Sequence, residues 1–499
     1  MGEPYYITTA INYPNGRPHI GHAYEAIAAD AMARFQRAQG RDVRFQTGSD
    51  EHGLKMAQAA RDANVEPLAY ADGTVAVFKD MDAALDISYD RFLRTTEPAH
   101  YRASQALWQC MADAGDLYLG RYEGWYSVRD EAFYDESELV GDCDEKLSPQ
   151  GTPVEWTVEE SWFFRLSAYG DRLLAHFAAN PEFIRPESRR NEVMRFVEGG
   201  LNDLSISRTS LDWGIPVPGS PGHVMYVWLD ALTNYLTGLG FPDGGADYDR
   251  YWPCDVHLIG KDVVRFHAVY WPAFLMSAEL PLPKQVFGHG HVLLRGEKMS
   301  KSVGNVVDPV EMAERFGVDP LRYFLLREIP FGQDGSYSDE AIVARTNAEL
   351  ANSFGNLAQR TLSMIHKNLD GVVPPVGTAP EDTKLLDDVT RACTETLPAE
   401  FERFAFSVGL EAWINAVFAC NAYVDAMAPW ALRKSDPARM EQVLGTLAAA
   451  IELLAKAVEP IVPGSAARLL AFLQEGRDSG RIGAPVPIFP RLELEPTAA

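Results

Sequence analysis

The sequence predicts an α/β fold: a doubly wound parallel sheet with an α+β insertion, followed by an α-helical bundle. In the first half of the chain, short aromatic and β-branched segments alternate with helical patterns, which is typical of parallel sheets. Residues 119–218 differ, because tryptophans and turn residues are frequent there. From about residue 318 onward the patterns are helical and rich in alanine, which favours a bundle.

The composition limits the class of protein. A chain of 499 residues with 46% apolar residues can build sizeable cores in about two to four units. The formal net charge of −25 argues against a general nucleic-acid binder, although a local basic surface remains possible. The five cysteines are widely spaced, and no apolar run reaches the roughly 20 residues that span a bilayer. We therefore expect a cytoplasmic protein with reduced thiols and no membrane segment.

The first predicted strand, residues 5–11, leads through a loop into a helix that begins near His22. His19, Gly21 and His22 lie at this junction. The start of a helix offers unpaired backbone N–H groups and can hold phosphate, and glycine lets a ligand approach the backbone closely. The alternative is an ordinary loop with two capping histidines.

Two further strands end in similar loops. Residues 42–47 lead to Asp50, and residues 256–259 lead to Gly260 and Asp262. Ligands bind beyond the carboxyl ends of strands in open α/β sheets. Asp50 can pair with a substrate ammonium or cap the next helix, and both roles can hold together. Asp262 can accept hydrogen bonds from ribose hydroxyls.

The second half of the sheet is expected to resume near residues 223–231 and to continue with a strand at 285–288. This last strand leads to a loop in which Lys298 and Lys301 flank Met299 and Ser300. Two lysines on a loop with Gly and Ser can place two cations on one polyphosphate. A solvated basic turn is the alternative for the loop taken alone.

The histidine and lysine loops, in this order and at this distance, resemble the signature pair of class I aminoacyl-tRNA synthetases. Within that class, several short stretches resemble the methionyl-tRNA synthetase family, and the resemblance extends over about residues 4–490. The chain has no room for the editing insertion of the isoleucine, leucine and valine enzymes, and it lacks the metal ligands of the cysteine enzyme. The stretches that carry the resemblance are residues 10–13, 48–53, 226–231, 260–262, 356–360 and 429–430.

The resemblance implies a domain organisation. A Rossmann-type catalytic domain would occupy residues 1–118 and 219–290, with a connective insertion at 119–218. Residues 291–345 would carry the lysine loop and contact the tRNA stem. An anticodon-binding helical domain with a C-terminal tail would occupy residues 346–499.

The resemblance also implies a reaction in which methionine and ATP form methionyl-adenylate, and the methionyl group then passes to the 3′-terminal ribose of tRNA(Met). The catalytic residues would be His19, His22, Lys298 and Lys301. ATP would contact His19, Gly21, His22, Gly260, Asp262, Lys298, Met299, Ser300 and Lys301. Methionine would contact Ile11, Tyr13, Asp50, Trp228, Ala231, Tyr235, Val263 and His267. The anticodon would contact Asn356, Arg360 and Trp430.

Each of these aromatic residues could also be plain core, and Trp430 could be packed into the bundle. Mg²⁺ is expected with ATP. We expect no structural zinc, because Ser127 and Asp130 stand where some relatives carry a Cys-x-x-Cys knuckle. The expected partners are L-methionine and the elongator and initiator forms of tRNA(Met). The chain ends soon after the predicted bundle, so we expect a monomer.

Two other functions fit part of the pattern. A nucleotidyltransferase that adenylates a small molecule would share the histidine loop but would not need the helical C-terminal third. A non-catalytic tRNA-binding paralogue would not need the histidines and lysines. Methionine-dependent exchange of pyrophosphate into ATP, followed by tRNA charging, separates the three.

Overall fold

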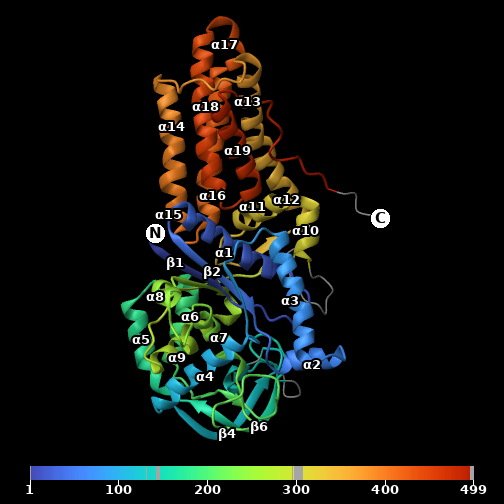
Figure 1. Ribbon diagram of the computed structural model, residues 1–499, viewed down its shortest axis with the longest axis vertical. Helices are drawn as coiled ribbons and strands as arrows, with labels where there is room; N and C mark the ends of the chain where they lie inside the picture. The colour runs from blue at the N-terminus through green and yellow to red at the C-terminus, as the bar shows by residue number, and fades with distance from the viewer. Residues whose placement is uncertain (1, 131, 142–145, 295, 297–306, 495–499) are drawn as a thin grey trace. The chain divides into compact units, whose positions relative to one another are not determined.

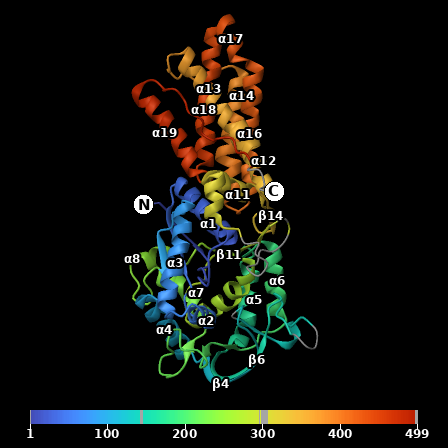
Figure 2. The same ribbon diagram turned by 90° about the vertical axis from the view of Figure 1, so that its right-hand side faces the viewer.

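The structure is a computed structural model that describes residues 2–130, 132–141, 146–294, 296 and 307–494 (Figures 1 and 2). The chain forms two compact units. The first contains Met1–Ala29, Gln39–Ala83 and Ile87–His289, and the second contains Asp30–Ala38, Ala84–Asp86 and Gly290–Ala499. In the described part of the chain, no helix is both long and apolar enough to cross a membrane.

The first unit is built on a six-stranded parallel sheet. The chain moves outward from the central strand to one side and then returns to continue on the other, so the sheet is doubly wound, as predicted. Ligands bind at such a switch point. In spatial order the strands are β3 (Arg91–Arg94), β2 (Asp42–Ser49), β1 (Pro4–Thr9), β11 (Val256–Gly260), β12 (Val286–His289) and β7 (Ile184–Arg185).

Helices cover this sheet, and the central strands are buried as a parallel sheet requires. Tyr6 of β1 has no exposed surface, and its hydroxyl donates to Gln46 Oε1 at 3.0 Å. One hydrophobic core joins β1 and β11 to helices α7 (Val227–Thr237) and α9 (Trp271–Ser277). The first helix, α1 (Ile20–Ala38), begins two residues before His22.

The expectation that residues 223–231 rejoin the main sheet is wrong. Val224–Met225 (β10) instead pairs with Ser207–Arg208 (β9) in an antiparallel ribbon, and α7 begins at Val227. Most of α7 is buried. A short, continuous apolar run does not distinguish a buried strand from a buried helix.

The α+β part of this unit is a four-stranded antiparallel sheet. Its long hairpin pairs β4 (Leu117–Ser127) with β6 (Glu155–Phe164), which lie side by side in Figures 1 and 2. Strands β5 (Ala132–Tyr134) and β8 (Leu204–Ser205) complete it. The turn region after β4 bears on the site described below.

The second unit is an α-helical bundle, as predicted. Trp413 of α16 is fully buried at its centre, where its indole N–H donates to the carbonyl of Leu454 at 2.9 Å. The tail packs back on the bundle through Asn347, whose side chain exchanges two 2.8 Å hydrogen bonds with the backbone of Leu492. The main helices are α13 (Asn356–Asn368), α14 (Pro380–Arg391), α16 (Phe406–Met427), α18 (Pro437–Val458) and α19 (Pro463–Ser479).

The remaining elements connect or flank these layers. In the first unit they are α2 (Leu54–Asp62), α3 (Pro67–Ala84), α4 (Pro98–Asp113), α5 (Gly170–Ala179), α6 (Glu187–Glu198) and α8 (Ala246–Tyr251). In the second they are β13 (Val292–Leu294), β14 (Gly335–Tyr337), α10 (Pro309–Phe316), α11 (Val318–Glu328), α12 (Asp339–Arg345), α15 (Leu397–Phe401) and α17 (Pro429–Ser435).

Candidate active site

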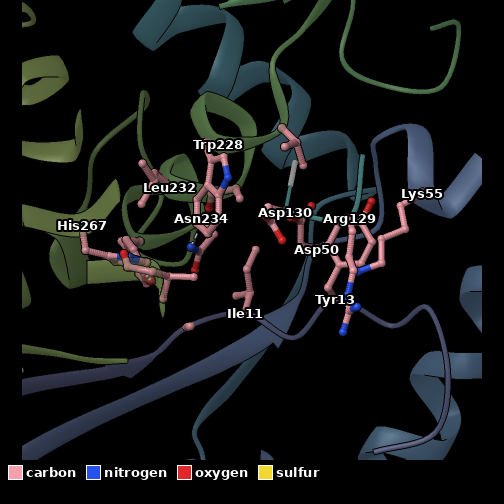
Figure 3. Close-up of a pocket in the computed structure, with 15 residues that line it drawn as sticks. Ile11, Tyr13, Asp50, Lys55, Arg129, Asp130, Trp228, Leu232, Asn234 and His267 are labelled. Carbon is pink, nitrogen blue, oxygen red and sulfur yellow. Dashed lines mark hydrogen bonds between the residues drawn. The ribbon is translucent and has the colours of Figure 1, made fainter. Parts of the chain in front are cut away.

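A cavity of about 190 Å³ lies at the carboxyl ends of the central strands (Figure 3). Every residue that the resemblance assigns to methionine lines it, although these residues come from four separate segments of the chain. The lining also contains residues that were not predicted, among them Lys55, Arg129 and Asp130. The full lining is Ala10, Ile11, Tyr13, Asp50, Lys55, Arg129, Asp130, Val227, Trp228, Ala231, Leu232, Asn234, Tyr235, Val263 and His267.

The loops after β1 and β2 are joined by backbone hydrogen bonds at the floor of this cavity. The N–H of Asn12 donates to the Gly48 carbonyl at 2.8 Å, and the N–H of Asp50 donates to the Asn12 carbonyl at 2.8 Å. Asp50 is 7% exposed, so its carboxylate is held at the cavity in a largely dry environment. These bonds fix the position at which a ligand ammonium would be recognised.

Tyr235 and His267 form a neutral, hydrogen-bonded wall. Burial lowers the pKa of His267 to about 4, so the ring is uncharged near neutral pH. Its Nδ1 donates to the carbonyl of Val263 at 3.0 Å, which leaves Nε2 to accept from the Tyr235 hydroxyl at 2.6 Å. The helix is wound more widely over Phe266–Tyr270, and such π turns are frequent at functional sites.

Trp228 lies beside this wall, with its ring centroid 6.2 Å from that of His267. Its ring stacks on Phe266 with centroids 3.7 Å apart and an interplanar angle of 5°. The indole N–H is buried and has no hydrogen-bond partner among the described residues. Buried donors are nearly always satisfied, so this group is suited to a polar atom of a ligand.

A buried network behind the cavity connects helix α7 to the loop after β2. Asp230 accepts from His52 Nδ1 at 2.6 Å and from His100 Nε2 at 2.8 Å. Burial raises the pKa of Asp230, but the two histidines outweigh that effect and lower it to about 2. The backbone carbonyl of His52 accepts from the hydroxyl of Tyr13 at 2.8 Å. The network therefore joins two walls of the cavity, and no sequence pattern indicates it.

The predicted histidine loop is compact. The rings of His19 and His22 stack with centroids 3.9 Å apart, and the His19 N–H donates to His22 Nδ1 at 3.1 Å. A Cβ on Gly21 would lie 2.9 Å from the ring of His19. Glycine at this position therefore permits the close turn with which α1 begins.

Gly260 ends β11, and Asp262 follows in an exposed single turn. Beside Gly260, Glu25 Oε2 and His289 Nε2 form a 2.8 Å contact that the sequence did not suggest. The predicted ATP-contacting residues Lys298, Met299, Ser300 and Lys301 lie outside the described residues.

The turn region after β4 is held by a single carboxylate. Asp130 Oδ2 accepts from the hydroxyls of Ser148 at 2.6 Å, Thr152 at 2.5 Å and Tyr134 at 3.0 Å. Ser127 Oγ lies 2.8 Å from Thr152 Oγ1 and accepts from the Asp130 N–H at 3.2 Å. Hydrogen bonds thus connect the two positions where some relatives carry cysteines.

The residues assigned to the anticodon lie in the second unit. Asn356 and Arg360 are exposed on α13. Trp430, at the start of α17, is 49% exposed, and the Arg360 guanidinium lies 5.6 Å from the centre of its ring. Arg360 and Trp430 are thus neighbours although they are far apart in the sequence.

The fold and the site define a class I aminoacyl-tRNA synthetase. Residues 5–362 match the family described as tRNA synthetases class I (M), and residues 373–481 match the anticodon binding domain of methionyl tRNA ligase. The chain is 56% identical to the methionine–tRNA ligase of Brucella suis over 98% of each protein. It belongs to the methionyl-tRNA synthetase family.

Solved structures agree with this assignment. The methionyl-tRNA synthetase of Mycobacterium tuberculosis in complex with methionyl-adenylate is 54% identical, with a TM-score of 0.95 over 98% of this chain and 100% of that chain. The apo form of the M. tuberculosis enzyme has a TM-score of 0.89 at 50% identity, over 99% of each chain.

Proposed function

We propose that the cavity in Figure 3 is the methionine site of a methionine–tRNA ligase. In the first step the methionine carboxylate attacks the α-phosphorus of ATP, giving methionyl-adenylate and pyrophosphate. In the second, a 3′-terminal ribose hydroxyl of tRNA takes the acyl group and AMP leaves. The observation that carries the proposal is that four separate segments bring every residue assigned to methionine to one cavity at the switch point.

The chemistry of the lining suits methionine. A thioether is apolar and polarizable and packs well against aromatic rings, which Tyr13, Trp228 and Tyr235 provide. Asp50 would pair with the substrate ammonium. His267 is neutral near pH 7, so the wall that it forms with Tyr235 places no charge beside the side chain of the substrate.

ATP would bind along the same edge of the sheet. The start of α1 supports phosphate, with His19 and His22 as directional donors beside Gly21. Gly260 and Asp262 would hold the ribose. Lys298 and Lys301, with Met299 and Ser300 between them, would neutralise charge that develops on the phosphates. Mg²⁺ would enter with ATP, bound to the phosphate oxygens.

The second unit would read the anticodon. Asn356 and Arg360 can reach base edges, and Trp430 offers an exposed ring on which an unpaired base can stack. We propose that elongator and initiator tRNA(Met) are both substrates. Each predicted domain would have its own role. Residues 1–118 and 219–290 would carry catalysis, and residues 119–218 would form the insertion. Residues 291–345 would contact the tRNA stem, and residues 346–499 would read the anticodon.

Three further features are proposed. The turn region after β4 binds no zinc, because hydrogen bonds to the Asp130 carboxylate already connect its segments. The enzyme acts as a monomer. It acts in the cytoplasm, where tRNA is charged.

The test is a pair of assays on the full chain. Methionine-dependent exchange of pyrophosphate into ATP without tRNA reports the first step, and esterification of tRNA(Met) reports the second. Exchange without charging would favour the nucleotidyltransferase alternative, and binding of tRNA with neither reaction would favour the non-catalytic paralogue.

A further inference from the structure

A second cavity lies on the four-stranded antiparallel sheet of the first unit. It has a volume of about 340 Å³, and its lining includes residues 122–125 of β4, residues 133–136, and residues 200–205 that lead into β8. Arg265 and Tyr270, which follow β11, also line it. No described residue lines both this cavity and the methionine cavity. We call it the hairpin cavity.

Negative charge dominates the lining of the hairpin cavity. Among the described residues that line it, the one lysine or arginine is Arg265, whereas carboxylates come from β4, from the turn after β5 and from the segment before β8. The negative charge is therefore distributed around the cavity and not gathered at one point. Such a surface repels phosphate and attracts cations. The carboxylates belong to Glu123, Asp135, Glu136, Glu138 and Asp203.

A lysine of the chain shows how this lining binds positive charge. Lys146 Nζ donates to the Glu136 carboxylate and lies 4.3 Å from the centre of the Trp125 ring. Its ammonium group thus contacts a carboxylate and the face of an aromatic ring, and both attract it. Both of these partners line the cavity.

Arg265 repeats this arrangement. Its Nη1 donates to Glu138 Oε1 at 2.9 Å, and its guanidinium carbon lies 3.9 Å from the centre of the Phe196 ring. Aromatic rings attract organic cations, but they supply no oxygen ligand to Mg²⁺ or Ca²⁺. Two such contacts at one cavity therefore favour an organic cation as its ligand.

Tyr270 supplies a polar group that is open to a ligand. The residue is only 9% exposed, and its hydroxyl forms no hydrogen bond with any described residue. Burial raises the pKa of Tyr270 to about 12, so near pH 7 its hydroxyl is neutral and can accept from an ammonium group. Buried hydroxyl groups nearly always have a hydrogen-bond partner, so this one indicates a ligand.

Trp156 forms an open part of the wall. It is 53% exposed and packs edge-on against Trp125, with ring centroids 5.3 Å apart and an interplanar angle of 77°. Glu123 is its diagonal neighbour on the same face, because Trp125 pairs with Trp156 and Glu123 with Val158. The Glu123 carboxylate also contacts Arg121 at 3.1 Å, in an exposed pair that contributes little. A ring and a carboxylate thus adjoin here as well.

We infer that the hairpin cavity binds a small linear polyamine, an organic cation in which methylene chains join two or more protonated amines. Its ammonium groups pair with Glu123 and Asp135 and donate to the Tyr270 hydroxyl, and a methylene chain packs on the Trp156 ring. The separated carboxylates match the separated charges of such a molecule. The inference does not depend on the proposed function, because the cavity is distinct from the methionine cavity.

The first experiment titrates spermidine into the full chain by isothermal titration calorimetry, with the ionic strength held constant by NaCl. One saturable site is expected. Tyr270→Phe should weaken binding about two- to tenfold, as for the loss of one hydrogen bond. Trp156→Ala should weaken it about two- to fivefold, as for an exposed cation–π contact. Val158→Ala is the matched control and should change nothing, because Val158 is also exposed on β6 but lies outside the cavity.

Two charge variants test the sign of the effect. Glu123→Gln should weaken spermidine binding about two- to fivefold, the range for one exposed ion pair. Lys146→Gln should strengthen it by a similar factor, because Glu136 and the Trp125 ring then become available to the ligand. Glu160→Gln removes an exposed carboxylate of β6 that lies outside the cavity, and it should leave binding unchanged.

Four results would overturn the inference. Binding that does not saturate, or that Glu160→Gln weakens as much as Glu123→Gln does, would show a general attraction to an acidic protein. Displacement of spermidine by an equal concentration of Mg²⁺ would assign the cavity to a metal ion. A trilysine peptide that binds more tightly than spermidine would assign it to a basic polypeptide.

Discussion

At the scale of single residues, Asp230 is the most constrained group near the site. Its carboxylate is fully buried between His52 and His100, and the two histidines are held in turn by Tyr101 and Thr237. Removing a buried carboxylate is costly, because the groups that donate to it lose an acceptor that water cannot replace.

Asp230→Asn should therefore destabilise the first unit by about 3 kcal/mol. The pH dependence follows from the pKa of about 2, which lies below the ordinary value of 3.8. A lowered carboxyl pKa stabilises the folded state above about pH 4, and this contribution is lost as the pH falls toward 2. Denaturant titrations measure the free energy of unfolding. The difference in this free energy between wild type and variant should be constant from pH 5 to 7. Below pH 4 it should become smaller by on the order of 2 kcal/mol.

The control for this prediction is Asp243→Asn, since the side chain of Asp243 is 78% exposed. It should leave the stability unchanged across the same range. A gap between wild type and Asp230→Asn that stays constant down to pH 2 would contradict the electrostatic account.

His267 and Tyr235 make a second prediction at this scale. His267→Leu removes the close acceptor of the buried Tyr235 hydroxyl and leaves it only the Thr9 carbonyl at 3.4 Å, at a cost of about 1–3 kcal/mol. The free energy of unfolding should fall by that amount, and the KM for methionine in pyrophosphate exchange should rise because a wall of the cavity is altered. Because the His267 pKa is near 4, the KM of the wild type should show no titration of this residue between pH 6 and 8.

Tyr235→Phe serves as the partner variant in a double-mutant cycle. If the hydrogen bond carries the effect, the double variant should lose much less than the sum of the two single losses. Additive losses would show that each side chain acts separately.

At the scale of elements, α17 presents Trp430 to solvent instead of burying it in the bundle. With 49% of its surface exposed, the ring offers an open face for stacking. Base stacking on such a ring contributes roughly 1–3 kcal/mol. Trp430→Ala should therefore lower aminoacylation at limiting tRNA about 5- to 150-fold, while pyrophosphate exchange without tRNA stays near that of the wild type.

Arg433→Ala, on the exposed surface of the same short helix, controls for general charge and folding effects. Equal losses in both assays for Trp430→Ala would mean that the side chain is needed for folding. No loss in either would place anticodon reading elsewhere and weaken the assignment of Asn356 and Arg360.

The hydrogen bonds in the turn region after β4 lead to a prediction about zinc. If Asp130 holds this region together, purified protein should contain no stoichiometric zinc, and chelators should leave the melting temperature unchanged. Asp130→Ala should lower that temperature, because three hydroxyl groups lose their acceptor. Tightly bound zinc at one ion per chain would refute the proposal.

At the scale of the whole molecule, the sequence predicts the main helices and strands better than it predicts which segments lie close together in space. The central strands and the long bundle helices were predictable because their apolar periods are regular. The short edge strands β3 and β7 carry too few residues to show a period. The sequence does not distinguish helix α7 from a buried strand, because its start is a short apolar run and the helix is buried on nearly all sides.

Some residues of the candidate site were also predictable from the sequence, and others were not. The eight residues that the family resemblance assigns to methionine all line one cavity, so their proximity could be expected from the sequence. Lys55, Arg129 and the Asp230 network could not, since their proximity arises from packing between segments that share no pattern. Lys298 to Lys301 remain a prediction from the motif alone.

The proposed monomeric state is also tested at this scale. Multi-angle light scattering at micromolar concentration should give the mass of one chain, 55.3 kDa. Twice that mass would contradict it.

The turn around Asp130 has a consequence for the supply of aminoacylated tRNA when zinc is scarce or oxidants are present. Its joining side-chain atoms in Ser127, Asp130, Ser148 and Thr152 are all oxygens. Thiolates are the ligands that peroxide oxidises and that soft metals capture, whereas hydroxyl and carboxylate oxygens resist both. An enzyme whose knuckle is closed in this way would retain the shape of its insertion when zinc is scarce or oxidants accumulate, and protein synthesis could begin without waiting for a metal.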